Sequence, residues 1–173
     1  ARGQDLAHGG AALAELDRID LSGLDRRISD SDISVACDVT NPLTGPEGAS
    51  AIYGPQKGAS PDMVVLLDNA LRNFARVVKA DLGADVDARP GAGAAGGLGG
   101  GLIAFLDAEL LPGVDLVLDT VELDRKLEDA DLVITGEGCL DYQTVYNKAP
   151  IGVANRAKAR NIPVVAISGS LGE

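Results

Sequence analysis

Aromatic side chains are scarce in this chain: they make up only 3% of its 173 residues, and tryptophan is absent. Hydrophobic residues nevertheless account for 46% of the sequence. The core must therefore be built mainly from Ala, Val, Leu and Ile, a composition that suits helices packed on a sheet. A chain of this length has material for one domain, or for one domain and part of a second.

Histidine and cysteine, which ligate metal ions and take part in nucleophilic catalysis, are also few. His8 is the only histidine, which argues against a His-rich metal site and against a Ser-His-Asp triad. The two cysteines, Cys37 and Cys139, are far apart in the chain and have no metal-ligand spacing. A disulfide between them stays open, but two buried, apolar thiols are the favoured interpretation.

Positive charge is in short supply, because the formal net charge is −11 and no run of Lys or Arg interrupts the acidic surface. Such a chain repels a phosphate backbone, so we expect no nucleic-acid partner. The sequence also lacks a signal peptide and an apolar run of about 18 residues, so we expect no membrane partner and a cytoplasmic location. The chain stops at "VVAISGSLGE", where a buried strand meets a turn, and we therefore expect a fragment.

The clearest predicted element is a helix over residues 61–80. Ser60 is a good N-cap, and Pro61 suits the first helical position. Apolar residues then recur on one face: Met63, Leu67, Ala70, Leu71, Phe74, Val77 and Val78. This pattern is typical of a core-facing helix with a solvated back. We also expect a helix near 9–17, a strand at 33–39, a helix at about 94–108 and a polar helix from "DRKLEDA". The segment "VDLVLDTV" fits a strand or a helix, and a helix is favoured.

The last part of the chain predicts a parallel βαβ unit. Residues 130–138 form an apolar run that ends in glycines, 149–161 are amphipathic, and 162–169 form a second apolar run. Strand, crossover helix and strand in this order make a parallel pair with a right-handed connection. The expected fold class is therefore α/β.

The stretch "PGAGAAGGLGGG", residues 90–101, contains seven glycines. Gly91, Gly93 and Gly96 match the dinucleotide fingerprint G-x-G-x-x-G, but "ADVDARP" before them is a poor strand, so the match is weak. Each glycine inside a helix costs about 1 kcal/mol relative to alanine. The cause of this composition is either close packing or a ligand that touches the backbone, and the sequence leaves both open.

Three polar side chains in the first half are candidates for ligand contact. Asp38 and Asn41 follow the predicted strand 33–39, at the kind of edge where α/β proteins bind ligands. Lys57, between glycines in "GPQKGAS", could supply a point charge for phosphate or carboxylate. The alternatives are that Asp38 and Asn41 cap the loop backbone and that Lys57 is a solvated turn residue.

The segment "TGEGCLD" and the lysine after it form the strongest candidate site. Glu137 and Asp141 follow a buried strand, and Gly136 and Gly138 allow close backbone approach. Two carboxylates there could hold Mg²⁺ or accept a proton from a substrate hydroxyl. Lys148 precedes the crossover helix, where it could face a phosphate.

Four segments in this order resemble the bacterial glycerate kinases of the single-chain class I family. They are "VACDVTNPLTGPEGASAIYGPQKGAS", "PGAGAAGGLGGGLIAFLDAEL", "DLVITGEGCLD" and "KAPIGVANRAK". The resemblance covers essentially all of the chain from Gly9 onward. It implies a three-layer α/β architecture in which a Rossmann-like domain, formed from both chain ends, carries an inserted α/β domain. Residues 1–130 would belong to the insert, and 131–173 would begin the return into a truncated Rossmann-like domain.

The resemblance also implies ATP-dependent phosphorylation of D-glycerate with Mg²⁺, with 2-phosphoglycerate as the favoured product. Asp141, Lys148 and Glu137 would be catalytic, and Glu137 and Asp141 would also be the magnesium ligands. Asp38, Asn41 and Lys57 would bind the substrate. The glycines near the ligand would be Gly91, Gly93, Gly96, Gly97, Gly136 and Gly138. The partners are then D-glycerate and ATP, and a homodimer is an assembly that the sequence allows.

Two positions depart from the family pattern. Asn147 stands where a Gly usually precedes the lysine, and Cys139 stands where an Arg is common. The N-terminal Asp/Ser/Lys loop and the "GGSATNDGG"-type segment have no counterpart, so the chain alone would be inactive. Two other functions stay open: an oxidoreductase that binds nicotinamide or flavin at Gly91–Gly96, with Asp115 near the ribose, and an incomplete fragment that only binds a small acid.

Overall fold

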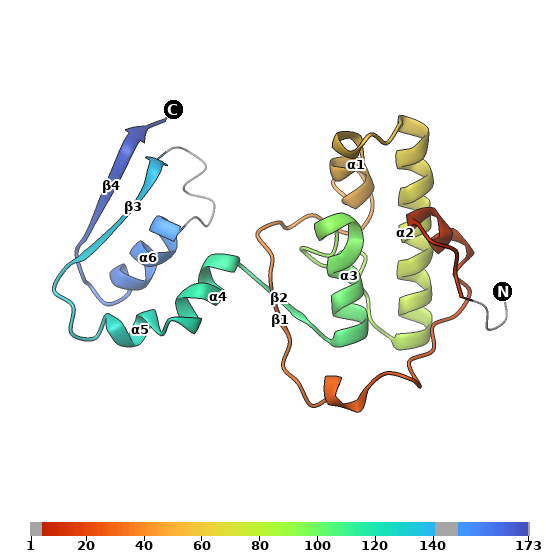
Figure 1. Ribbon diagram of the computed structural model, residues 1–173, viewed down its shortest axis with the longest axis horizontal. Helices are drawn as coiled ribbons and strands as arrows, with labels where there is room; N and C mark the ends of the chain where they lie inside the picture. Colours follow the sequence, from red (N-terminus) through yellow and green to blue (C-terminus); the bar gives the residue numbers. More distant parts are fainter. Residues whose placement is uncertain (1–4, 141–148, 173) are drawn as a thin grey trace. The chain divides into compact units, whose positions relative to one another are not determined.

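The computed structural model describes residues 5–140 and 149–172. They form two compact units, Ala1–Leu110 and Leu111–Glu173, called here the N-terminal and the C-terminal unit. Figure 1 shows helices in both units and a pair of strands in each. The α/β class expected from the sequence is confirmed. The expected boundary near residue 130 concerns the domains of a longer protein, and it stays a prediction.

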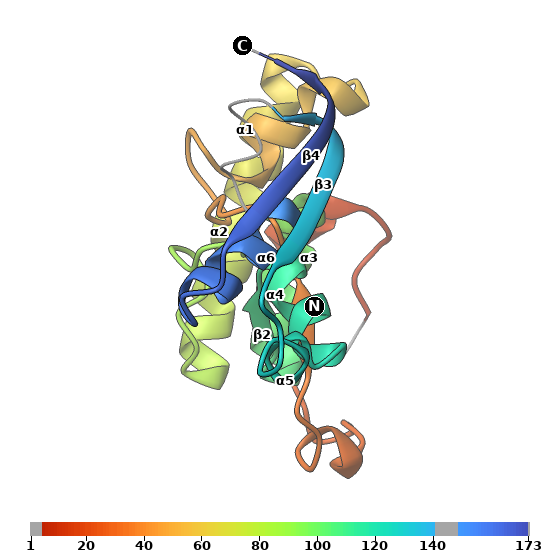
Figure 2. The same cartoon turned by 90° about the vertical axis from the view of Figure 1, so that its left-hand side faces the viewer.

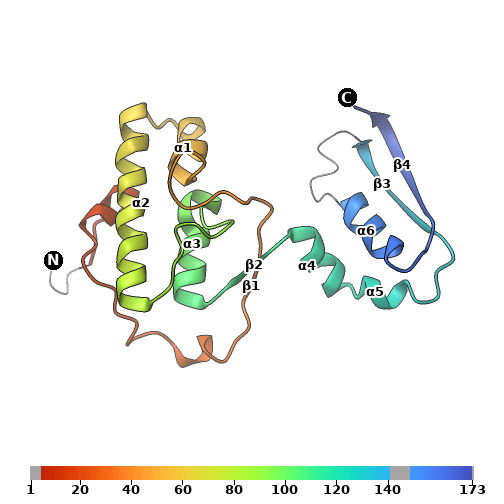
Figure 3. The ribbon, with the colours of Figure 1, turned by 180° about the vertical axis from the view of Figure 1, so that it is seen from behind.

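The N-terminal unit is mainly helical. Its elements are η1 (Gly10–Glu15), η2 (Arg26–Ile28), β1 (Ser34–Ala36), α1 (Ala49–Tyr53), η3 (Pro55–Lys57), α2 (Pro61–Leu82), α3 (Ala94–Leu106) and β2 (Glu109–Leu111). Helices α1, α2 and α3 pack against one another (Figure 3). Among the described residues β1 pairs with β2 alone, and at Ser34–Ala36 it is shorter than the predicted strand 33–39.

Helix α2 supplies most of the core of the N-terminal unit, as its sequence predicts. The Ser60 side chain accepts a hydrogen bond from the backbone N–H of Met63, and Gly83 ends the helix in the left-handed conformation. Phe74 meets Phe105 of α3 edge to face, with ring centroids 6.0 Å apart. Met63 is an exception to the predicted buried face, because it is 51% exposed and borders a cavity.

Helix α3 has an irregular beginning that the sequence does not predict. Ala95, Gly96 and Gly97 have φ values of 51°, 80° and 103°, so three consecutive residues are left-handed. This conformation is open to glycine but strained for alanine. The regular part of α3 therefore starts after Gly97, later than the predicted start at 94.

The C-terminal unit contains α4 (Gly113–Thr120), α5 (Leu123–Lys126), β3 (Val133–Leu140), α6 (Ala149–Lys158) and β4 (Val164–Leu171). β3 and β4 are parallel, with Val133 opposite Val164 and Leu140 opposite Leu171. The predicted βαβ unit is thus confirmed. Leu127, Val133 and Ala157 form its small core, between the sheet and the helices.

One face of the β3–β4 sheet is not covered by any of the described residues of the C-terminal unit, 111–140 and 149–172. Alternation along the strands turns Val133 and Val164 toward α6 and turns Ile134 and Ile167 the other way. Ile134 is 64% and Ile167 62% exposed. Figure 2 shows the two strands with α6 behind them.

Candidate functional site

The glycine-rich stretch 90–101, called here the glycine tract, holds the loop that contains Asn41 in place. The backbone N–H of Gly93 donates to the carbonyl oxygen of Asn41 at 3.0 Å. A Cβ atom at Gly93 would lie 2.2 Å from the carbonyl oxygen of Pro42, so no other residue fits without movement of the loop. Packing between two backbone segments is therefore one physical cause of the glycine at position 93.

Four other glycines of the tract fall into two groups. At Gly91, Gly97 and Gly99 an added Cβ would lie within 3.0 Å of a neighbouring atom. Gly96 has a left-handed φ of 80° but open space at its Cβ position. Most of the tract is thus explained by close packing, whereas Gly96 faces a cavity.

The Asn41 side chain is held by the protein itself. Its amide nitrogen donates to the Glu47 carbonyl oxygen at 2.8 Å, and its amide oxygen accepts from the Tyr53 hydroxyl at 2.7 Å. Asn41 therefore caps the loop after β1, one of the two roles that the sequence left open. Asp38 is exposed in the same loop, and it has an interaction within the protein.

Cys37 lies beside the glycine tract, and its thiol donates to the carbonyl oxygen of Val39 at 3.3 Å. A Cβ at Gly91 would lie 3.0 Å from the Cys37 sulfur. Both Cys37 and Cys139 are free and half-buried. The expectation that both thiols are buried is therefore wrong, because each is only half-buried. Cys37 lies at the edge of the helical core, and Cys139 lies on a two-stranded sheet.

Lys57 borders a cavity of about 280 Å³ in the N-terminal unit. Its walls come from η1, α1, α2 and the left-handed turn of α3, and they include Ser50, Tyr53, Met63, Leu67 and Gly96. Lys57 has no ion pair among the described residues. The structure thus brings Lys57 and Gly96 together. It also adds Ser50 and Tyr53, which sequence reasoning missed although both precede "GPQKG" closely.

At the carboxyl end of the parallel strands, β3 extends further than predicted. It runs to Leu140, so Glu137 lies within the strand and not after it. Glu137 is half-buried, pairs in register with Ser168, and has an interaction within the protein. Gly136 is needed for strand pairing, because a Cβ there would lie 2.2 Å from the Ile167 carbonyl oxygen. Gly138 has open space at its Cβ position.

Two of the predicted catalytic residues, Asp141 and Lys148, lie outside the described residues. Within 5–140 and 149–172 no group of three or more His, Cys, Asp or Glu side chains could hold a metal ion. Glu137 alone does not make a magnesium site. The described part of the chain therefore does not test the magnesium prediction.

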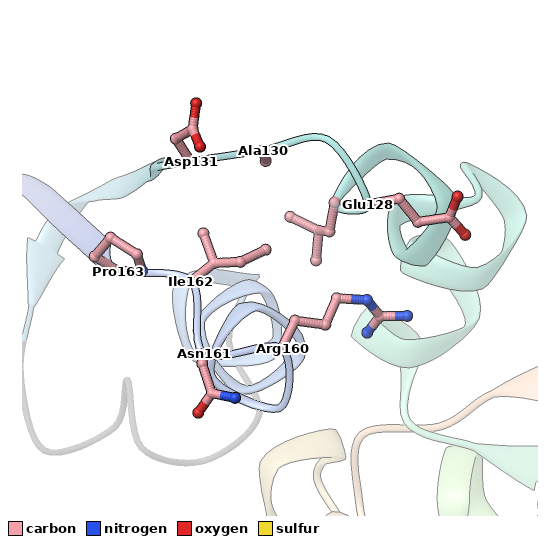
Figure 4. A pocket seen from close by; sticks show the side chains of 8 residues that line it. Glu128, Ala130, Asp131, Arg160, Asn161, Ile162 and Pro163 are labelled. Atoms are coloured by element: carbon pink, nitrogen blue, oxygen red, sulfur yellow. The ribbon is translucent and has the colours of Figure 1, made fainter.

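A cavity of about 520 Å³ lies at the opposite end of the strands (Figure 4). It is lined by Leu127, Glu128, Ala130, Asp131, Arg160, Asn161, Ile162 and Pro163. Asp131 and Pro163 precede β3 and β4, so this cavity faces the amino ends of the strands. Open α/β sheets bind ligands at the carboxyl ends, which makes this cavity a poor candidate.

Arg156 of α6 is the centre of an ion-pair cluster in the C-terminal unit. It contacts Asp119 at 2.7 Å and Asp115 at 3.4 Å on α4, and it also pairs with Asp124 on α5. Hydrogen bonds with Asp119, and next with Asp124, raise the pKa of Arg156 above its ordinary value. The guanidinium therefore stays charged at any ordinary pH, and its partners make this cluster structural.

The dinucleotide alternative lacks its structural context. Residues 84–90 form no strand before Gly91, as the poor strand pattern predicts. The fingerprint needs a strand that ends at its first glycine.

None of the helices in the described part of the chain has both the length and the apolar character needed to cross a membrane.

The comparisons agree with the sequence resemblance. The family model described as Glycerate kinase family matches residues 1–173. The chain is 55% identical to a glycerate kinase of Halalkalibacterium halodurans and 54% identical to the glycerate 2-kinase of Escherichia coli K12. In both cases the match covers 99% of this chain and 45% of the relative, so the chain spans about half the length of these relatives.

A solved structure matches in three dimensions as well. The crystal structure of a protein described as glycerate kinase 2 from Salmonella typhimurium LT2 superimposes with a TM-score of 0.90 at 56% identity. The match covers 98% of this chain and 46% of that one. On its sequence and its fold, the chain belongs to the glycerate kinase family.

Proposed function

We propose that this chain is part of an enzyme that transfers the γ-phosphoryl group of ATP to a hydroxyl of D-glycerate, with 2-phosphoglycerate as the product. The observation that carries this proposal is the family match over residues 1–173, together with 54% identity to a glycerate 2-kinase. Because the chain covers 45% of that relative, the activity belongs to a longer protein. A cytoplasmic location and a homodimer are proposals of the same kind.

The reaction needs positively charged groups at its site, and this chain is strongly acidic. ATP and glycerate are both anions, and the chain has a net charge of −11. Phosphoryl transfer depends mainly on positioning and on neutralising the charge of the transferred group. We assign this role to Lys57 and Lys148. Lys57 is supported by its lack of an ion pair among the described residues.

The acidic candidates are assigned to the reacting hydroxyl. Asp141 or Glu137 would accept its proton, a task for which a carboxylate must lie within hydrogen-bond reach of the hydroxyl. Mg²⁺, when bound, would neutralise phosphate charge, with Glu137 and Asp141 as the proposed ligands. Of these two proposed ligands, Glu137 lies in the described part of the chain and Asp141 lies outside it.

The loop after β1 would present Asp38 to glycerate. Asn41 contributes by holding that loop, since both ends of its side-chain amide are engaged by Glu47 and Tyr53. Gly91, Gly93 and Gly97 serve the same loop and α3 through packing. Gly96 and Gly138, which have open space at their Cβ positions, remain the proposed points of close approach to a ligand, whereas the space beside Gly136 is filled by the backbone of β4.

The test uses a full-length protein that contains this sequence, with Asp141→Ala and Lys148→Ala as variants and Lys126→Gln as the matched surface control. A coupled assay measures glycerate-dependent release of ADP. Each active-site variant should lower kcat/KM at least about 100-fold, equivalent to about 2.7 kcal/mol. Lys126→Gln should leave kcat/KM within about twofold.

Two results would count against the proposal. ADP release that does not depend on glycerate would remove glycerate as the acceptor. Near-normal turnover in both variants would remove Asp141 and Lys148 from the site while leaving the activity itself in place.

A further inference from the structure

The loop after β1 is anchored at its centre to other segments of the N-terminal unit. The backbone N–H of Leu43 donates to the Asp87 carbonyl oxygen at 2.9 Å, and the Thr44 hydroxyl donates to the Asp87 carboxylate at 2.7 Å. The backbone N–H of Gly45 donates to the carboxylate of Asp68, on α2, at 2.8 Å. Leu43 and Thr44 are both buried. The centre of the loop is therefore held by several contacts besides those of Asn41.

Tyr53, the last residue of α1, is hydrogen-bonded to the same loop. Its hydroxyl donates to the side-chain oxygen of Asn41 at 2.7 Å. The Asn41 side-chain nitrogen donates to the Glu47 carbonyl oxygen at 2.8 Å, which fixes the orientation of the amide because a carbonyl oxygen can only accept. Tyr53 thus ties the end of α1 to the anchored loop through one oriented side chain.

The turn that carries Lys57 follows Tyr53 directly and is built on Gly54. The Gly54 carbonyl oxygen accepts hydrogen bonds from the backbone N–H of Lys57 at 2.9 Å and of Ala59 at 3.1 Å. A Cβ at Gly54 would lie 2.4 Å from the Ser50 carbonyl oxygen, so this turn packs closely onto α1. The place of the Lys57 backbone therefore depends on how the end of α1 is held.

We propose that Tyr53 is a positioning residue of the glycerate site, which sets the spacing between the loop that carries Asp38 and the turn that carries Lys57. The inference rests on the proposed function, in which both of these side chains bind glycerate. Because glycerate is small, groups on two separate segments can contact it together only at a narrow range of spacings. Tyr53 acts through Asn41 and does not itself touch the substrate.

The experiment uses a full-length protein that contains this sequence and measures glycerate-dependent release of ADP. Tyr53→Phe removes the hydroxyl and keeps the ring. It should raise the KM for glycerate at least about fivefold, since the Asn41 oxygen loses its donor. It should change kcat and the KM for ATP by less than about twofold, because the loss concerns the binding of glycerate.

Thr120→Val is the matched control, because it removes a hydroxyl whose hydrogen bond, to the Leu116 carbonyl oxygen at 2.7 Å, stays within α4. It should leave both KM values within about twofold of the wild-type values. Circular dichroism checks that every variant is folded. A variant with Asn41→Ala tests the route: in that background Tyr53→Phe should raise the glycerate KM by less than about twofold, because its partner is already absent.

The outcomes separate this inference from the proposed function. An unchanged glycerate KM in Tyr53→Phe, with a wild-type protein that phosphorylates glycerate, would overturn the positioning role alone. An equal effect of Tyr53→Phe with and without Asn41→Ala would also overturn it, since Tyr53 would then act independently of Asn41. Wild-type ADP release that does not depend on glycerate would overturn the proposed function and this inference with it.

Discussion

At the scale of single residues, the glycines of the tract differ in what they do. Gly93 has an ordinary helical φ of −76°, so its backbone does not require glycine. Space is the constraint, because the Pro42 carbonyl oxygen occupies the place of a Cβ. Gly96 is the opposite case, with a left-handed φ and free space. The same residue type thus answers two different physical needs a few positions apart.

Gly93→Ala should lower the free energy of unfolding by about 2–3 kcal/mol, because overpacking forces the loop at Pro42 to move. Gly23→Ala is the control, since a Cβ at Gly23 meets nothing within 4 Å. It should change stability by no more than about 0.5 kcal/mol. Urea unfolding of the chain without any ligand measures both. Equal stability of the two variants would show that packing does not explain Gly93.

At the scale of elements, Arg156 ties α6 to α4 and α5. Its side chain is 24% exposed and lies among three carboxylates. Arg160 also reaches Asp124, at 2.6 Å. The three helices are short, so ion pairs between them supplement a small core of Leu127, Val133 and Ala157. The basic end of α6 thus joins the helices of the C-terminal unit.

Arg156→Ala should destabilise the C-terminal unit by about 1–3 kcal/mol, because it leaves partly desolvated carboxylates close to one another. Arg125→Ala removes a comparable arginine whose pair with Glu122 is exposed, at 72% and 60%. That control should cost less than about 1 kcal/mol. Thermal unfolding at neutral pH compares the two. The raised pKa of Arg156 means that, on the alkaline side, this stabilisation is lost only when the pH rises through the range in which the arginine itself loses its proton.

At the scale of the whole molecule, the uncovered face of the β3–β4 sheet is the most conspicuous surface. Ile134, Ile167 and Leu171 are 64%, 62% and 82% exposed. Parallel sheets are normally covered on both faces, because their crossovers place helices there. An apolar sheet face in water favours association with another surface. We therefore expect the 173-residue chain to self-associate at high concentration.

The double variant Ile134→Thr with Ile167→Thr should reduce this association and shift sedimentation toward the monomer. Threonine keeps the β-branched shape that strands prefer, so the fold should persist. Ile52→Thr, on α1 and 46% exposed, is the control and should leave association unchanged. Association that is equally strong in the double variant would show that the contact lies elsewhere.

Local patterns were enough to predict much of this protein. The cap at Ser60, the apolar face of α2 and the two apolar runs around α6 predicted a helix and a parallel βαβ unit, because these signals depend on residues close in sequence. The four family segments predicted the glycerate kinase family for a different reason, since their order and spacing are specific. The absence of a strand before Gly91 also followed from two aspartates and a proline in "ADVDARP".

Only the tertiary structure decided which neighbours these residues meet. Pro42 and Gly93 are far apart in the chain, so no local pattern could show that one fills the space beside the other. The same holds for the cavity that gathers Leu13, Ser50, Lys57 and Gly96. Sequence thus determined the elements and the family through short-range preferences. Long-range packing determined that Asn41 is a loop cap and that Lys57 borders an apolar cavity.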